Sequence, residues 1–189
     1  MSERWPIEVR FGGLGGQGLV TLGAVLADAG ARAGLHVAAS QSYGSRARGG
    51  ATRSDVILSA GPIDFPHVHH PDLLVVLAKE AYDLYAPDVR PGGAILADEF
   101  FVHGVDERQG LSQHLLPGTA LALEQLDSRV AANFVMLGAV LGFSRIVDAE
   151  HVRASMAELV AARFLELNVR ALGLGLEQGH ALAERHPWR

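Results

Sequence analysis

The stretch FGGLGGQGL, Phe11 to Leu19, decides the fold of this 189-residue chain, because a strand pattern ends in it and a helix pattern begins in it. Ile7 to Phe11 alternates as a strand does, and Gln17 to Gly34 repeats apolar residues at helical spacing. Three glycines between these patterns have the spacing G-x-G-x-x-G: Gly13, Gly15 and Gly18. Such a turn lets the backbone approach a phosphate closely, and the unpaired N–H groups that open the helix favour a negative charge. The sequence therefore predicts a strand–turn–helix unit that holds an anion.

Strand and helix patterns follow one another along most of the chain. Further strands are expected at residues 36–40, 52–59, 72–78, 94–97 and 116–123, and helices at residues 80–85, 128–143 and 148–184. The last helix is expected to break at Gly173, Gly175 and Gly179. The tail after Ala183 is expected to fray. This order predicts the α/β class, with a three-layer Rossmann-like sheet and a helical C-terminal third, and residues 1–189 are expected to form a single domain.

The composition excludes several kinds of site. The chain has no cysteine, so it holds no disulfide, no thiolate-ligated iron–sulfur cluster and no cysteine-based zinc site of its own. A net charge of −5 gives no general attraction for nucleic acid or for an anionic membrane. No apolar run reaches the roughly 20 residues of a membrane span, and Met1 to Trp5 leaves no room for a signal peptide. We therefore expect a cytoplasmic protein that binds neither nucleic acid nor a membrane.

A second informative stretch is the loop QSYGSRARGGATR, Gln41 to Arg53, which is rich in arginine and glycine. It follows the strand expected at 36–40, and loops at the carboxyl ends of neighbouring strands in an open α/β sheet meet in one crevice. Arginine binds phosphate or carboxylate through two parallel hydrogen bonds, and glycine lets backbone amides approach the same group. We therefore expect this loop and the glycine turn to face one ligand. The candidate binding residues are Gly13, Gly15, Gly16, Gln17, Gly18, Ser42, Tyr43, Gly44, Arg46, Arg48, Gly49 and Gly50.

A dinucleotide-binding dehydrogenase is the first alternative. It needs a carboxylate about 20 residues beyond the glycines to hold the ribose, and Ala38 to Gln41 offers none. A free-standing NADP- or nucleotide-binding Rossmann-like module stays open, because Arg46 or Arg48 can accept a 2′-phosphate. A free-standing RNA binder that uses the same loop is disfavoured by the acidic net charge and by the scarcity of aromatic residues beside Tyr43.

Three histidines in the segment HVHHPD raise the question of a metal site: His67, His69 and His70. Their spacing places no two of them on one helical face, and Pro66 and Pro71 enclose them in a turn. Solvated loop histidines are the simpler interpretation, so we predict that this chain holds no metal.

Other polar residues near the expected strand ends and helices carry less information. Glu80 and Asp98 follow apolar strands but have no base or nucleophile paired with them in the sequence, so we expect capping or surface roles and no catalytic residue. Asn133 opens an apolar helix and either binds backbone across an interface or satisfies a polar contact in the core. Gly138 and Gly142, four residues apart on that helix, allow close helix packing.

Five segments together resemble one known family. They are GGLGGQG at 12–18, QSYGSRARGG at 41–50, DLLVVLAKEAYDLY at 72–85, PGGAILAD at 91–98 and NFVMLGAV at 133–140. In this order they resemble the gamma subunit, or gamma domain, of the 2-oxoacid:acceptor oxidoreductases, which include pyruvate and 2-oxoglutarate ferredoxin oxidoreductases. Ser45 and Arg46 stand where the family pattern usually has Pro-Glu, so the loop is more basic than the pattern.

The resemblance implies a non-catalytic part of a larger enzyme that converts a 2-oxoacid to acyl-CoA and is inactive on its own. Thiamine diphosphate, Mg²⁺ and [4Fe-4S] clusters would then lie on partners, namely the alpha and beta thiamine-binding subunits and a ferredoxin-like subunit or ferredoxin. The glycine turn, with Arg46 or Arg48, would help to form the coenzyme A site. Alternatively these loops form the interface with the thiamine-binding subunits, or serve a scaffold that binds nothing. A homodimer of the isolated chain is allowed, and the 2-oxoacid itself is not fixed by the sequence.

Overall fold

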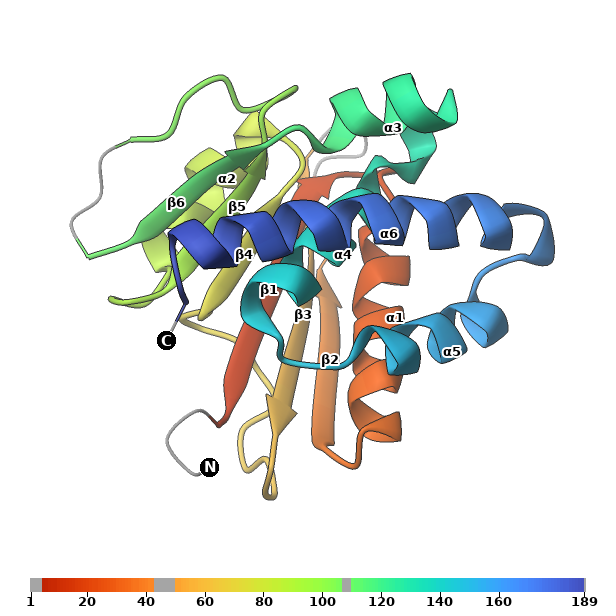
Figure 1. Cartoon of the computed structure of the whole chain (residues 1–189). Helices are drawn as coiled ribbons and strands as arrows, with labels where there is room; N and C mark the ends of the chain where they lie inside the picture. The colour runs from red at the N-terminus through yellow and green to blue at the C-terminus, as the bar shows by residue number, and fades with distance from the viewer. Residues whose placement is uncertain (1–4, 43–49, 107–109, 189) are drawn as a thin grey trace.

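A mixed sheet lies at the centre of the computed structural model, which describes residues 5–42, 50–106 and 110–188 (Figure 1). Within these residues the sheet has six strands in the order β2-β3-β1-β4-β5-β6. Their bounds are β1 Ile7–Leu14, β2 His36–Ser42, β3 Ala51–Ser59, β4 Leu73–Val76, β5 Ala94–Asp98 and β6 Ser112–Leu116. β1, β4, β5 and β6 run parallel, whereas β3 runs antiparallel to both of its neighbours. β2 therefore points the same way as β1.

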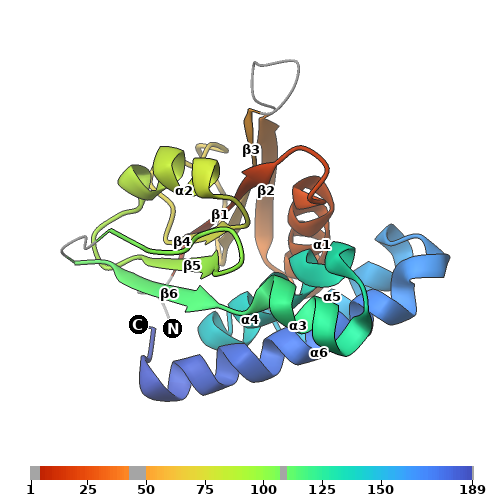
Figure 2. The same ribbon diagram turned by 90° about the horizontal axis from the view of Figure 1, so that it is seen from above.

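Helices cover both faces of the sheet and complete three layers (Figure 2). The described ranges contain α1 Leu19–Arg32, α2 Lys79–Tyr85, α3 Gly118–Leu126, α4 Ala132–Ser144, α5 Ala149–Leu159, α6 Ala162–Arg185 and the short 3-10 helices η1 Ala86–Asp88 and η2 Arg129–Ala131. α2 packs on one face of the sheet, and α1 and α4 lie on the other. α5 packs on α1, and α6 packs on α4. The predicted α/β class and the helical C-terminal third are confirmed.

The glycine turn after β1 lies at the edge of the sheet where β2 also ends. Leu14 at the end of β1 pairs with Ala51 at the start of β3, and Ser42 at the end of β2 pairs with Arg53. The glycine turn and the described residues that flank the second loop therefore lie at the same edge. β3 lies between β1 and β2, however, so the strand after α1 is not the neighbour of β1 that it is in a dinucleotide-binding unit.

A buried ion pair joins the neighbouring strands β1 and β3 on the face that carries α2. The side chain of Arg10 is 1% exposed, and its Nε and Nη2 donate to the carboxylate of Asp55 at 2.8 and 3.0 Å. Nη2 also donates to the carbonyl oxygen of Val68 at 2.7 Å, and Nη1 lies 3.2 Å from the carboxylate of Asp88. Arg10 thereby fastens a loop and the end of η1 to the sheet, a role that no pattern in the sequence indicated.

The strand expected at 116–123 is wrong. β6 ends at Leu116, and α3 begins at Gly118. Pro117 has no N–H for a strand ladder. The fully buried carboxylate of Asp98 accepts hydrogen bonds from the backbone N–H and the hydroxyl of Thr119, at 3.1 and 2.5 Å. These contacts fix the first turn of a helix, and they join residues too far apart for a local pattern to show.

The breaks expected at three glycines of the last helix are also wrong. α6 runs unbroken through Gly173, Gly175 and Gly179, and the chain bends instead at 160–161. A β-carbon on Gly175 would meet the carbonyl oxygen of Val135 in α4, so packing between the helices explains this glycine. At 24 residues α6 is the longest described helix, and no helix in the described ranges is long and apolar enough to cross a membrane.

The tail does not fray in the way expected after Ala183. α6 continues to Arg185, and Trp188 is only 6% exposed because its ring packs 6.2 Å from the ring of Phe143 in α4. His186 lies 5.0 Å from the ring of His114 in β6. Tertiary contacts with α4 and β6 therefore hold the end of the chain.

We predict that Gly175→Ala destabilises the protein by about 1–3 kcal/mol, because the added methyl group overpacks the contact between α6 and α4. Gly173→Ala is the matched control, since a β-carbon there meets nothing within 4 Å and the helix gains up to about 1 kcal/mol. Urea unfolding followed by circular dichroism measures both. Equal stability of the two variants would contradict the close packing.

Acid should destabilise the fold through His114. Burial lowers the pKa of His114 below its ordinary value of 6.5, and the neighbouring His186 and Arg185 lower it further. The unfolded chain therefore binds a proton at this position more readily than the folded chain, so stability falls as the pH drops from 6.5 toward the folded pKa. We expect the Tm of His114→Gln to fall less than that of the parent between about pH 7 and pH 5. Parallel falls in Tm would refute this assignment.

Candidate functional site

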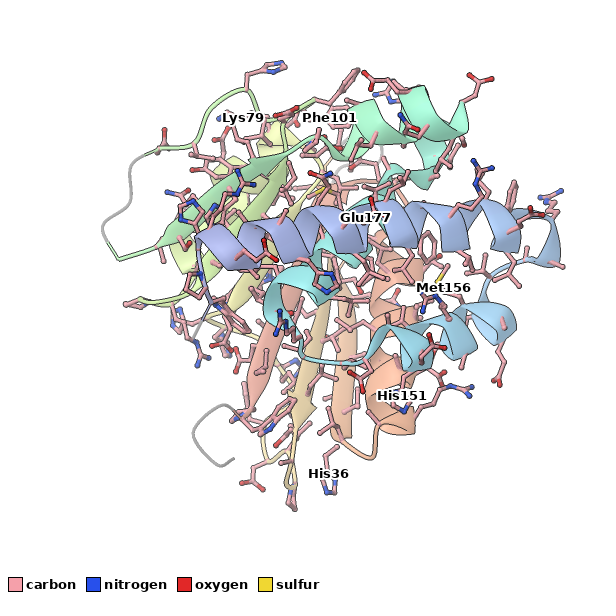
Figure 3. All side chains as sticks on the ribbon, viewed as in Figure 1. His36, Lys79, Phe101, His151, Met156 and Glu177 are labelled. Carbon is pink, nitrogen blue, oxygen red and sulfur yellow. The ribbon has the colours of Figure 1, made fainter. Side chains whose placement is uncertain are left out.

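A pocket of about 380 Å³ opens where the glycine turn meets the start of α4. Its described lining residues are Gly15, Gly16, Gln17, Gly18, Leu77, Phe101, Thr119, Arg129, Val130, Ala132 and Asn133. They come from the turn after β1, the end of β4, the segment after β5, the start of α3 and the approach to α4. Figure 3 shows Phe101 at the same edge of the sheet as Lys79, the first residue of α2. The pocket thus lies at the carboxyl edge, where ligands of open α/β sheets bind.

The turn that forms one wall requires glycine at two positions. Gly16 and Gly18 have φ values of +91° and +74°, a left-handed conformation that other residues rarely adopt. A β-carbon on Gly18 would also meet the side-chain nitrogen of Asn133. Gly18 is the N-cap of α1, so the first N–H groups of that helix have no helical partner and lie beside the pocket.

The side chain of Gln17 holds this turn against the sheet through two hydrogen bonds. Its Oε1 accepts the N–H of Leu14 at 2.6 Å, and its Nε2 donates to the carbonyl oxygen of Leu77 at 2.7 Å. Asn133 Nδ2 donates to the carbonyl oxygen of Gln17 at 3.3 Å, and Asn133 Oδ1 accepts the N–H of Phe134 at 2.8 Å. Of the two roles left open for Asn133, the structure therefore shows a polar contact within the chain.

Arg129 supplies the charge of the pocket. Among the described residues that line it, Arg129 alone is charged at neutral pH. Its guanidinium carbon lies 5.3 Å from the ring centre of Phe100 and 5.0 Å from that of Phe101, within the range of cation–π contact. The aromatic rings hold an otherwise exposed cation at the wall of the pocket. The sequence analysis did not predict Arg129 as a site residue. Its position just before the apolar helix is the one feature of the sequence that could have indicated it.

The two carboxylates singled out from the sequence have structural roles. Asp98 is fully buried and accepts hydrogen bonds from Thr119 and from the N–H of Phe100 at 3.2 Å. Glu80 is exposed in the first turn of α2, where a negative charge favours the helix dipole. The expected capping and surface roles are confirmed.

The structure brings together four of the twelve predicted binding residues: Gly15, Gly16, Gln17 and Gly18. Gly13 is buried behind them, because its space is filled by the side chain of Gln17. Ser42 and Gly50 flank the loop at the same edge of the sheet but do not line the pocket. Predicted residues Tyr43, Gly44, Arg46, Arg48 and Gly49 lie outside the described residues.

The three histidines line a different pocket, next to Arg10 and Arg53 on the α2 face. The ring of His69 stacks on that of Phe65, with centres 5.4 Å apart. Across the described ranges, no group of three or more histidine, cysteine, aspartate or glutamate side chains is arranged to hold a metal ion.

Comparison with known proteins identifies relatives over nearly the whole chain. The family model for pyruvate ferredoxin/flavodoxin oxidoreductase matches residues 8–178. The 2-oxoglutarate synthase subunit KorC of Methanocaldococcus jannaschii is 39% identical over 173 residues, which cover 90% of this chain and 92% of the relative. These findings support the resemblance stated above and give no support to a free-standing NADP- or nucleotide-binding module.

Solved structures agree with the sequence relatives. The keto/oxoacid ferredoxin oxidoreductase gamma subunit of Geobacter sulfurreducens PCA has a TM-score of 0.83 and 34% identity, covering 93% of this chain and 99% of its own. The 2-oxoglutarate:ferredoxin oxidoreductase of Magnetococcus marinus, solved with 2-oxoglutarate, coenzyme A and succinyl-CoA bound, has a TM-score of 0.87. At 24% identity it shows the fold alone, over 97% of this chain and 32% of its own. The chain therefore belongs to the pyruvate ferredoxin/flavodoxin oxidoreductase family, as a gamma-type subunit of a 2-oxoacid:ferredoxin oxidoreductase.

Proposed function

We propose that this chain serves in a complex that converts 2-oxoglutarate to succinyl-CoA. The KorC relative carries the proposal, since its name specifies 2-oxoglutarate and its likeness extends over 90% of the chain. In such a reaction the bond between the carboxylate and the keto carbon breaks and carbon dioxide leaves. Two electrons pass to the acceptor, and the acyl group joins the thiol of coenzyme A with release of a proton.

Partner subunits are proposed to hold the reactive cofactors. Without a cysteine, this chain has no thiolate to ligate an iron–sulfur cluster. We assign thiamine diphosphate and Mg²⁺ to alpha and beta subunits, and [4Fe-4S] clusters to those subunits, a ferredoxin-like subunit or ferredoxin. The isolated chain is then inactive, and its contribution is to shape a binding site on the assembled enzyme.

The pocket at the glycine turn is proposed to receive part of coenzyme A. Backbone N–H groups at the start of α1 and the guanidinium of Arg129 provide hydrogen-bond donors for a phosphate. Leu77, Phe101 and Val130 provide apolar wall for the uncharged part of the molecule. One cation held over aromatic rings beside a glycine turn suits a ligand that is partly anionic and partly apolar.

The loop between β2 and β3 is proposed to complete the site or its border with the partners. Support comes from the described residues on either side of this loop, because Ser42 and Gly50 lie at the edge of the sheet where β1 ends and the pocket opens. The residues predicted to act from it are Tyr43, Gly44, Arg46, Arg48 and Gly49. If Arg46 and Arg48 assist coenzyme A binding, then the double substitution by alanine raises the KM for coenzyme A.

Arg129→Ala is expected to raise the KM for coenzyme A in the assembled complex by about tenfold, the loss of one charge-assisted hydrogen bond. The KM for the 2-oxoacid should stay within twofold of the parent. Arg163→Ala is the matched control, since Arg163 is also an exposed arginine held over a phenylalanine ring, at 4.7 Å from Phe164. Steady-state kinetics of both variants tests the site, and an unchanged KM for coenzyme A in Arg129→Ala removes the pocket from coenzyme A binding.

The substrate is tested on the complex recovered with the tagged chain from its native host. We expect thiamine-containing partners in the eluate and coenzyme A-dependent reduction of a dye, with the highest kcat/KM for 2-oxoglutarate. Pyruvate and a branched-chain 2-oxoacid are the comparison substrates. A preference for either would overturn the choice of 2-oxoglutarate, and an eluate without partners or activity would contradict the proposed assembly.

A further inference from the structure

β2 is the last strand on its side of the sheet, and within the described residues no strand pairs with its outer edge. The direction of its peptide groups follows from β1. The carbonyl oxygens of Glu8 and Gly12 accept N–H groups from the two ends of β4, so even-numbered residues of β1 face β4 and odd-numbered residues face β3. Even-numbered residues of β3 therefore bond to β1, and its odd-numbered residues bond to β2. In β2 the even-numbered residues bond to β3, so Val37 and Ala39 direct their N–H and C=O groups outward.

Along His36–Ser42, the described residues of this edge carry no charged side chain, proline or bulge that would protect it against pairing with another strand. Free edges are commonly guarded by charged residues, proline or a bulge, which prevent association. β2 reads HVAASQS from His36 to Ser42 and has no lysine, arginine, acidic residue or proline. In a chain where 20% of residues are charged, a seven-residue edge strand without charge, exposed or half-buried along its length, is suited to pairing with another strand.

The side of α1 next to this edge is also uncharged. α1 turns Gly23 and Gly30 to the sheet, where β-carbons would meet Ser54 and Leu58, and directs Arg32 to Glu158 of α5. The space at Gly30 is also bordered by Val37 of β2, which puts the neighbouring side of α1 next to this edge strand. Four exposed or half-buried residues form that side: Val20, Ala24, Ala27 and Ala31.

We propose that the outer edge of β2 and this side of α1 form a two-fold interface between two copies of the chain. Two β2 strands would pair antiparallel about Ala39, which joins the two sheets into one. Neighbouring strands lie about 4.8 Å apart, and α1 contacts both β2 and β3, so the two α1 helices would lie about 10 Å apart. Helices pack at this separation when small residues face each other, as the alanines of α1 would.

A second copy suits this surface because the surface is complementary to itself. A two-fold axis brings β2 against β2 and α1 against α1 of the second copy. A charge on either element would therefore face a like charge and be repelled. Neither β2 nor the alanine side of α1 carries a charge. The peptide groups of Ala39 meet those of Ala39 in the second copy, which run in the opposite direction, as in an antiparallel ladder.

A single introduced cysteine tests the pairing, because the chain has no other. Ala39→Cys places two thiols across the axis, where Cα atoms of a hydrogen-bonded antiparallel pair lie about 5.5 Å apart, within disulfide range. Mild oxidation is expected to give a covalent dimer of twice 20.1 kDa on a non-reducing gel. Ala181→Cys, exposed on α6, is the matched control and should give little dimer. Equal cross-linking of the two variants overturns the proposal.

Light scattering of the full-length chain provides the second measurement. The parent is expected to have the mass of a dimer at about 100 µM, well above a micromolar Kd. Ala31→Glu should halve that mass with unchanged circular dichroism and Tm, while Ala181→Glu stays dimeric. Ala39→Pro should also be monomeric, since its outward N–H takes no part in the sheet of its own chain.

Two results of the light-scattering measurement overturn the proposal. A monomeric parent does so, and so does a dimer that persists in both Ala31→Glu and Ala39→Pro, because the contact then lies elsewhere. A monomeric parent whose Ala39→Pro variant loses its partner subunits assigns this edge to a different protein.

Discussion

The close contact between α4 and α6 is the constraint on which the rest of the structure depends. α4 is buried on every side, so it must be enclosed between the sheet and another helix. Gly138 and Gly142 of α4 meet Gly175 and Gly179 of α6, and a β-carbon at any of the four would meet the backbone of the opposite helix. This contact sets how α4 lies on the sheet. It therefore also places the residues just before and at the start of α4, which form one wall of the pocket.

The candidate site is formed where two such constraints meet. One is the left-handed turn after β1, which glycine permits and the side chain of Gln17 holds against β4. The other is the start of α4, which brings Asn133 against that turn and Arg129 over the aromatic rings after β5. Neither segment makes a pocket alone. The gamma-type subunit thus brings together Arg129, the one charged residue among the described lining residues, and the free N–H groups of α1 from regions more than a hundred residues apart.

Sequence patterns predicted the elements that are determined by interactions between residues close together in the chain. The strand–turn–helix unit at Gly13 to Gly18, the buried strand β4 and the apolar face of α1 follow from periodicity and turn chemistry, and the structure confirms them. The start of α3 depends on Asp98 and the continuity of α6 depends on α4, so both escaped local reasoning. Arg129 was missed for the same reason, since only the fold brings it to the glycine turn. That the whole chain is a single domain, and that the loop after β2 binds a ligand, stay predictions.

The amide of Gln17 gives the pocket one wall that is costly to move. Displacing the turn would break its hydrogen bonds to Leu14 and Leu77 and the one from Asn133, each worth about 1 kcal/mol. On the opposite wall, Val130 is 79% exposed and faces solvent. The wall at Gln17 is therefore costlier to displace than the wall at Val130, and a neighbouring subunit that covered Val130 would narrow the entrance from that side.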